Sequence, residues 1–324
     1  MAFPLMPFYD AINVVAYDDL DPDAVVRDRE LGERIREYGK ICPAGSPDFA
    51  LAVQRGAEWR IIHTGACEPA SARYGLAAHL RRGSDREHDP ALVRAMLRVA
   101  DRLDPEDGEQ VPKDEWEIGD RRYRVIRIER FTLINKSGME PPRASDVEPP
   151  KERHLLEGHL IDPLAPAGQW EAQLRLNLVT YLPPAGGVPP QVALEARHAV
   201  RSHPAVVLLP PEYTIVEIRD GGRSWEPFGG GHGPLHARDW LAAYFSELLP
   251  RLREFQGSPG TEEEQASWRR AADRVREMPG PDFLVAGRHF RTVRVSRMLR
   301  LSTDGPEPPR PSDQERYGYV PPPS

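Results

Sequence analysis

Arginines recur at every third position in two separate stretches of this chain. The arginines that could act together are Arg124, Arg127, Arg130, Arg291, Arg294 and Arg297. A guanidinium group presents a planar fork of N–H donors that matches carboxylates and phosphates. If two related strands carry these groups, the arginines could converge on one pocket for an anion or a carboxylate.

Acidic residues follow both arginine runs at corresponding positions, and they support a second interpretation. The residues after the runs that could form structural ion pairs are Glu140, Arg143, Asp146, Glu307, Arg310 and Asp313. Because arginines and acids recur together, we favour an internal ion-pair network over a pocket. An unpaired buried charge costs several kcal/mol. A buried Arg127 therefore requires a carboxylate, which we expect from Glu140 or Asp146 of its own stretch.

The two arginine stretches belong to a longer repeat. Residues 116–146 align without a gap with residues 283–313, at an offset of 167, and eleven of the 31 positions are identical. Unrelated segments would match at roughly two positions. The chain is therefore predicted to be a tandem duplication.

The repeated signature resembles that of an uncharacterised actinobacterial protein family. It is carried by residues 123–130 with 138–146, and again by residues 290–297 with 305–313. The family's members are soluble proteins of about this length, described as a domain of unknown function. The resemblance implies a cytoplasmic bacterial setting, but it brings no activity and no catalytic residues.

His232 lies in a glycine-rich stretch, residues 228–233, just ahead of a predicted helix. Backbone N–H groups at a helix N-terminus attract anions, so this stretch could hold a small anion. It lacks the lysine and the hydroxyl residue of a phosphate-binding P-loop. The first half of the chain has no equivalent glycine run, and a plain flexible loop is the favoured interpretation.

Four residues near the middle of the chain are of metal-binding types, namely His154, Glu157, His159 and Asp162. On a helix, the spacing of the two histidines does not place both rings on one face, and no cysteine is nearby. We therefore expect no metal site and no cofactor. The sequence also lacks the common hydrolase, metalloprotease and redox motifs, so no catalytic residue is predicted.

Composition restricts the class of protein. A net charge of −7 and a pI near 5.9 disfavour a general nucleic-acid binder, because phosphate binding relies on positive charge. The sequence has no apolar run of the ~18 residues that span a membrane, and its N-terminus lacks the features of a signal peptide. Cys42 and Cys67 are too few for a disulfide framework. We expect a cytoplasmic protein without membrane contact.

Hydrophobic patterns predict the order β-α-β-β-α-α-β-β for each half. The first strands are expected at residues 12–17 and 177–181, which are similar runs of apolar and β-branched residues. Hairpins are expected at residues 49–62 and 213–225, and a long strand at residues 122–133. Apart from one extra helix and a split last strand, this is the β-α-β-β-α-β order of a ferredoxin-like α+β fold.

The predicted domain organisation follows from the repeat. We expect a first α+β unit at residues 1–146, a proline-containing connector at 147–170 and a second unit at 171–324. Each sheet would be covered by helices on one face and would bury the other face against its neighbour. The two units are expected to pack with pseudo-two-fold symmetry.

These features favour a non-enzymatic binding or interaction protein, with a protein partner or a small anionic ligand. The alternative is a small-molecule enzyme of the α+β-barrel type, with a cavity between the sheets or between the units. A cavity above roughly 300 Å³ with convergent polar groups would support the enzyme. A sealed interface would support the binding protein.

Overall fold

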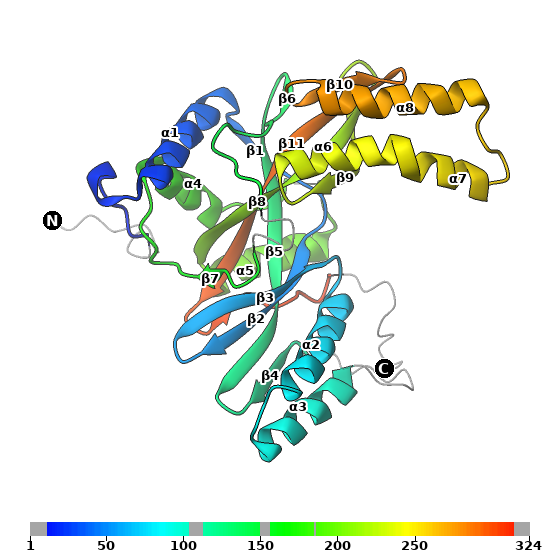
Figure 1. Ribbon diagram of the computed structural model, residues 1–324. Helices are drawn as coiled ribbons and strands as arrows, with labels where there is room; N and C mark the ends of the chain where they lie inside the picture. Colours follow the sequence, from blue (N-terminus) through cyan, green and yellow to red (C-terminus); the bar gives the residue numbers. More distant parts are fainter. Residues whose placement is uncertain (1–11, 104–112, 150–155, 185, 314–324) are drawn as a thin grey trace.

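The computed structural model describes residues 12–103, 113–149, 156–184 and 186–313. These residues form an α+β structure around one large antiparallel sheet (Figure 1). The strands are β1 (Lys40–Pro43), β2 (Asp48–Arg55), β3 (Glu58–Ala66), β4 (Glu115–Ile118), β5 (Arg121–Asn135), β6 (Gly138–Met139), β7 (Leu160–Ile161), β8 (Ala205–Arg219), β9 (Ser224–Gly231), β10 (Asp282–Val285), β11 (Arg288–Ser302) and β12 (Gly305–Pro306).

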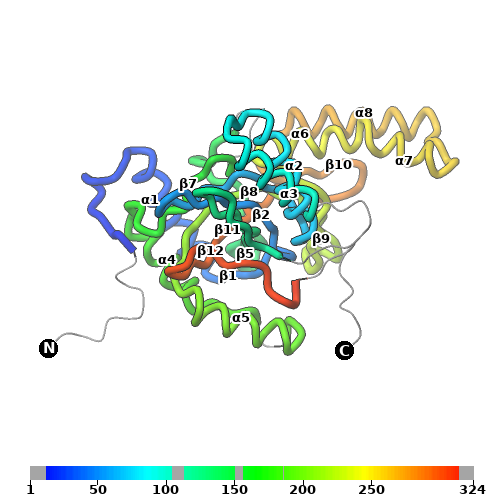
Figure 2. The backbone as a smooth tube through the Cα atoms, turned by 90° about the horizontal axis from the view of Figure 1, so that it is seen from below, coloured from blue at the N-terminus to red at the C-terminus, as the bar shows by residue number. Residues whose placement is uncertain are grey.

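The helices lie on both sides of this sheet. They are α1 (Pro22–Glu37), α2 (Pro69–Ser84), α3 (Pro90–Leu103), α4 (Gln169–Val179), α5 (Pro190–Ser202), α6 (Pro234–Ala243), α7 (Leu249–Phe255) and α8 (Glu262–Glu277), with a 3₁₀ turn at Tyr17–Asp19 and a π-helix at Tyr244–Leu248. Figure 2 shows α5 on the opposite side of the strands from α2 and α6. Among the described helices, none combines the length and apolar character needed to cross a bilayer.

Two long strands form the centre of the sheet. The main path of strands runs β7-β3-β2-β5-β11-β8-β9, so β5 and β11 are central neighbours. They pair antiparallel, with Arg130 opposite Arg297. These two arginines hold the same position in the two sequence repeats, so the pairing brings corresponding residues together.

Each half of the sheet has its own helix-covered core. In the first half, Leu76 and Leu80 of α2 pack with Tyr123 and Val125 of β5. In the second half, Leu241 of α6 and Val275 of α8 pack with strand residues that include Phe290 of β11. Alternate residues of β5 point the other way, and Ile126 and Ile128 pack with Val207, Leu299 and Leu301 of the second half. The apolar surface between the halves is therefore buried.

The predicted first strand is wrong in both halves. Residues 12–17 contain only an isolated bridge between Val14 and Ala167, followed by the 3₁₀ turn. Residues 177–179 are the last turn of α4, where Leu174 and Leu178 lie one helical turn apart and are buried together. Arg300 of β11 stabilises this helix end, because its guanidinium group donates to the backbone oxygens of Leu178 and Val179.

The predicted hairpins and the predicted long strand agree with the structure. The hairpins are β2–β3 and β8–β9, and the long strand lies within β5. Thr261 and Glu264 have the sequence spacing of a capping box, and α8 begins there with both hydrogen bonds of that box present. The glycine-rich stretch differs from the favoured loop, because residues up to Gly231 belong to strand β9.

Candidate functional site

Arg127 and Arg294 of the arginine runs bind acids from the opposite repeat. The Nε atom of Arg127 donates to Asp313 at 3.1 Å, and its Nη1 donates to Glu129 at 2.8 Å. In the same way, the Nε atom of Arg294 donates to Asp146 at 3.1 Å. Arg127 therefore pairs with Glu129 of its own stretch and with Asp313 of the other repeat, so the expectation of Glu140 or Asp146 as its partner is wrong. Arg294 likewise takes Asp146 from the other repeat. The acid of the other repeat comes from 186 residues later in the first case and 148 residues earlier in the second.

The cause of this exchange is the path of the chain after each central strand. We call residues 138–146 and 305–313 the first and second tails. The second tail lies along β5, where the N–H of Arg127 donates to the backbone oxygen of Glu307 at 2.9 Å. The first tail lies along β11, where the N–H of Arg294 donates to Glu140 O at 2.8 Å. Each tail therefore adds main-chain and charged contacts to the other half.

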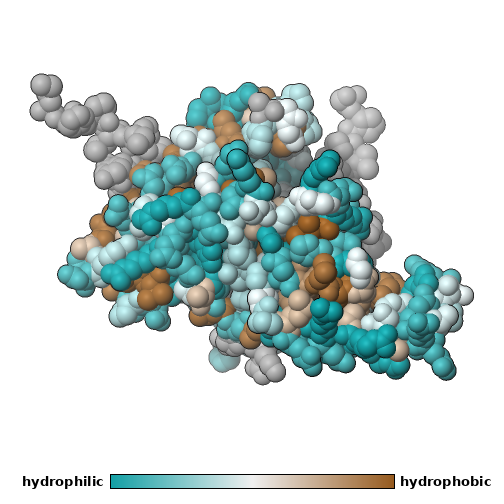
Figure 3. Space-filling model, turned by 90° about the horizontal axis from the view of Figure 1, so that it is seen from above, coloured by the Kyte–Doolittle hydropathy of each residue, from teal (hydrophilic) through white to brown (hydrophobic). Residues whose placement is uncertain are grey.

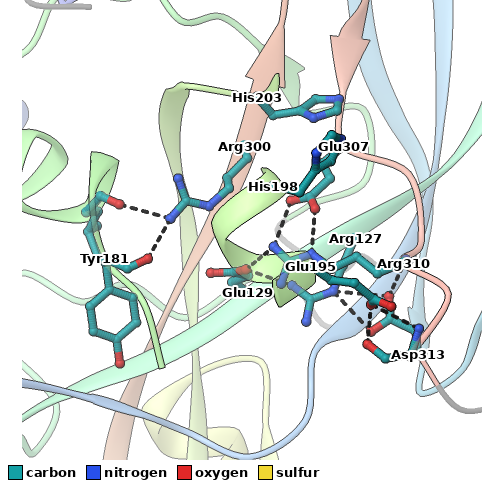
Figure 4. Close-up of polar contacts among 12 residues, drawn as sticks. Arg127, Glu129, Tyr181, Glu195, His198, His203, Arg300, Glu307, Arg310 and Asp313 are labelled. Carbon is teal, nitrogen blue, oxygen red and sulfur yellow. Dashed lines mark hydrogen bonds and ion pairs between the residues drawn. The ribbon is translucent and has the colours of Figure 1, made fainter. Parts of the chain in front are cut away.

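Ion pairs within each tail complete the network. Arg143 donates to Glu140 at 2.6 Å, and Arg310 donates to Glu307 at the same distance. Figure 4 shows Arg310 and Arg127 converging on Glu129 and Asp313. Each of the six residues predicted to form structural ion pairs takes part in one.

Glutamates of two helices hold the tails in place. Glu30 of α1 accepts hydrogen bonds from the N–H groups of Ala144 and Ser145, at 2.8 and 3.0 Å. Glu195 of α5 accepts from the N–H of Ser312 at 3.1 Å. Burial opposes ionisation of Glu30, but the hydrogen bonds from Ser145 and Ala144 prevail and lower its pKa.

Two glycines allow each tail to pass a tryptophan of the other half. Gly138 has φ +124° and faces Trp225, and Gly305 has φ +119° and faces Trp59. A β-carbon on Gly305 would lie 2.7 Å from the Trp59 ring, closer than real side chains approach. Positive φ and close contact both require glycine here.

The other arginines of the runs have partners too. Arg124 donates to Glu115 and to Asp304, both at 2.6 Å, and Arg291 donates to Asp282 at 2.7 Å. Hydrogen bonds from Arg122 and Arg124 lower the pKa of Asp304. Arg297 donates to Pro210 O at 2.8 Å and lies 3.5 Å from Glu212. These arginines therefore have their charges compensated inside the protein.

The anion site predicted at the N-terminus of α6 is occupied by the chain's own carboxylate. Glu148 accepts a hydrogen bond from the N–H of Leu235, in the first turn of this helix. Gly233 packs directly against Glu148, and Gly229 packs against Trp240 of α6. The glycines therefore allow close packing of strand, helix and Glu148.

Arg130 and His232 are the two predicted binding residues that line a common cleft. Its volume is about 470 Å³. The wall includes Glu212, Thr214, Phe228, Gly230, His232 and His236 from the second half, with Arg130 from the first. Arg130 forms an ion pair with Glu212, and its Nε lies 3.4 Å from Asp48. We call this feature the Arg130 cleft.

Burial shifts the pKa values of two side chains near Arg130, namely Asp48 and His232. Burial, with a smaller contribution from the Glu212 charge, raises the pKa of Asp48 to about 6. Burial lowers the pKa of His232, and the neighbouring His236 and Arg297 act in the same direction. His232 is therefore a neutral imidazole at pH 7, with one donor and one acceptor nitrogen.

Sequence reasoning missed Asp48, Glu212 and His236. The two acids are far apart in the chain, but Asp48 pairs with Ile128 and Glu212 pairs with Val295. Ile128 and Val295 hold the same position in the two repeats. An alignment of the strands next to the arginine runs would therefore have found a repeated acid.

Fold and site together define an α+β protein with a buried ion-pair network and a cleft lined from both halves. Three of the four residues of metal-binding types, Glu157, His159 and Asp162, lie in the described part of the chain, whereas His154 lies outside it. Within the described ranges, no cluster of three or more histidine, cysteine or acidic side chains could hold a metal ion.

Comparison with known families assigns the chain. The sequence profile of a family of unknown function (DUF5954) matches residues 21–316, and the chain belongs to this family. A search of the curated proteins and of the solved structures returns no match.

Proposed function

We propose that this protein is a non-enzymatic binding protein that holds a small ligand with a carboxylate or phosphate group in the Arg130 cleft. The observation that supports this proposal is the Arg130 cleft. Its volume of about 470 Å³ lies in the range of small-molecule sites, and polar groups from both halves meet there.

Arg130 is the proposed anchor for the anionic group. A guanidinium group has five N–H donors, and Asp48 and Glu212 use the Nε and Nη2 sides of this one. The Arg130 side chain is 21% exposed, whereas those of Arg124 and Arg297 are 4% exposed. Arg291 is similarly exposed at 20%, but Arg130 is the arginine of the runs that lines this cleft.

His232 and His236 would bind the polar remainder of the ligand. Their ring centroids are 5.6 Å apart, and both side chains line the cleft. A neutral imidazole has one donor and one acceptor nitrogen, so His232 can add a polar contact to the ligand. This mixed character suits a hydroxylated or amide-bearing carboxylate better than inorganic phosphate.

A second candidate is an enzyme that uses the same cleft. The observation in its favour is that a neutral imidazole and a carboxyl with a pKa of about 6 lie close to one arginine. Groups that titrate near the working pH are suited to general acid–base catalysis. Recovery of the bound ligand unchanged after long incubation would support the binding protein, and its conversion would support the enzyme.

We also infer that the scaffold arose by tandem duplication, with a pseudo-two-fold axis between Arg130 and Arg297. The exchanged contacts of the tails support this inference, because each contact has a counterpart in the other half. Each half would keep the part of a ferredoxin-like order that follows the first strand. The unit boundaries at residues 1–146, 147–170 and 171–324 and the cytoplasmic location stay part of this proposal.

Thermal-shift titration with a panel of carboxylates and phosphate esters tests the binding proposal. A ligand at 100 times its Kd should stabilise the wild type by about 2.7 kcal/mol. Thr214→Tyr fills the cleft and His232→Ala removes a lining group, so both should lose most of this shift. His88→Ala, which changes an exposed histidine outside the cleft, should keep it. Equal stabilisation of the wild type and Thr214→Tyr, or no stabilisation by any anion of the panel, would overturn the proposal.

A further inference from the structure

A helical arm projects from the second half of the protein. Helix α6 continues through the π-helix Tyr244–Leu248 into α7, and α8 returns beside it (Figure 1). The corresponding helix of the first half, α2, is a single helix of 16 residues. Short π-helical insertions within α-helices often mark functional positions. The second half has therefore extended this helix beyond what the core requires.

The outer part of the arm carries an apolar stripe that faces solvent. Leu248 is 43% exposed, Leu252 is 42% exposed and Phe255 is 92% exposed. These residues are four and three positions apart, so they share one face of the helix. Leu249 packs toward the core of the second half, and none of the residues of α7 is buried.

The charges of α8 are separated along the arm. Glu262 and Glu263 begin the helix at the tip, and the exposed Arg269 and Arg270 lie about two turns further in. Seven residues of helix span about 10 Å. When two such arms lie side by side in opposite directions, the acidic end of each meets the basic segment of the other.

We propose that the arm docks on the arm of a second copy of this chain, in an isologous antiparallel contact. With the two-fold axis at Leu252, the Leu252 side chains of both copies meet, and Phe255 of each copy packs near Leu248 of the other. A two-fold contact needs a surface that is complementary to itself, and this stripe and charge pattern meet that condition. Two helices from each copy would form a four-helix contact.

The distribution of apolar surface around the arm is consistent with a contact that involves only the arm. In the space-filling view, apolar surface lies where the arm leaves the body, and the arm beyond is mostly hydrophilic on the face shown (Figure 3). Leu284, on strand β10, is 62% exposed but lies off the stripe. It offers a matched control, because it tests the loss of an exposed leucine away from the proposed contact.

Analytical ultracentrifugation of the full chain, with light scattering after gel filtration, tests this proposal. The wild type should form a concentration-dependent dimer, and Leu252→Ser should raise the dimer Kd by roughly thirtyfold or more, as expected for a buried central residue. Phe255→Ser should act in the same direction, whereas Leu284→Ser should leave the Kd unchanged. All three positions are exposed, so unchanged circular dichroism and melting temperature will show that the variants fold.

Exchange of charged residues on α8 provides the second part of the test. Glu262→Lys with Glu263→Lys should weaken the dimer, and adding Arg269→Glu with Arg270→Glu should restore it. A wild type that stays monomeric up to about 100 µM overturns the proposal, as does a dimer that survives Leu252→Ser. A loss of dimer that the second charge exchange fails to restore refutes the antiparallel arrangement.

Discussion

Replacing Arg127 by methionine should destabilise the protein strongly, although this residue contacts no ligand in our proposal. Arg127 is 8% exposed and forms ion pairs with two carboxylates, those of Asp313 and Glu129. Methionine preserves most of the side-chain volume and removes the charge. The variant therefore tests the ion-pair network rather than the packing of β5.

The size of the effect follows from what the substitution leaves behind. Glu129 keeps Arg310 as a partner at 2.6 Å, but Asp313, whose side chain is 5% exposed, loses its guanidinium group. Breaking a buried pair by removing one partner costs about 3–5 kcal/mol. Arg121, at the start of the same strand, is 26% exposed and lies 3.8 Å from Glu87 and 3.7 Å from the exposed Asp120. Arg121→Met should therefore cost no more than about 1 kcal/mol.

Urea denaturation of a double-mutant cycle measures the network directly. Arg127→Met and Asp313→Leu should each destabilise, and the double variant should lose less than the sum of the two because no charge is left stranded. The equivalent variant of the second half, Arg294→Met, should behave like Arg127→Met. A wild-type urea midpoint for Arg127→Met, or simple additivity in the cycle, would refute the reasoning.

Three further predictions concern single positions. Hydrogen bonds from Arg288 hold the pKa of Glu217 at about 2, below its ordinary value. This carboxylate therefore stabilises the fold above about pH 4.5 and loses that effect as the pH falls to 2. The difference in unfolding free energy between wild type and Glu217→Gln should be widest at pH 7 and should disappear in acid. Burial raises the pKa of Asp48 to about 6, so its charge destabilises the fold as the pH rises through that value. In urea titrations, Asp48→Asn should therefore become more stable relative to wild type as the pH rises from about 4 to 7. Gly305→Ala should cost about 1–3 kcal/mol more than Gly257→Ala in thermal melts, because both have positive φ but only the first meets a tryptophan ring.

Local sequence signals predicted those elements whose residues make mostly local contacts. Thr261 and Glu264 mark the start of α8 because both halves of a capping box lie within four residues. Residues 177–181 misled for the opposite reason. Their apolar, β-branched composition is typical of a strand, but burial against α1 and β11 and the hydrogen bonds from Arg300 stabilise a helix end there.

The sequence predicts which residues form the ion-pair network, but it does not predict which arginine pairs with which acid. The repeat shows that arginines and acids occur together, yet spacing within one repeat cannot distinguish Asp146 from Asp313 as the partner of Arg127. That choice depends on the antiparallel pairing of β5 with β11 and on the path of each tail. The Arg130 cleft was harder still, because Asp48 and Glu212 reach it from strands far apart in the sequence.

The exchanged tails set the order of events during synthesis. The main-chain acceptor of Arg127 is Glu307, and its carboxylate is Asp313, near the end of the described chain. At about 5–20 residues per second, a ribosome makes these partners roughly 10–40 s after Arg127. Throughout that interval Arg127 has Glu129 as a partner but lacks Asp313 and the backbone oxygen of Glu307. Completion of the ion-pair network in the first half therefore waits until residues 305–313 have been made, and removing these residues would leave Arg127 without Asp313.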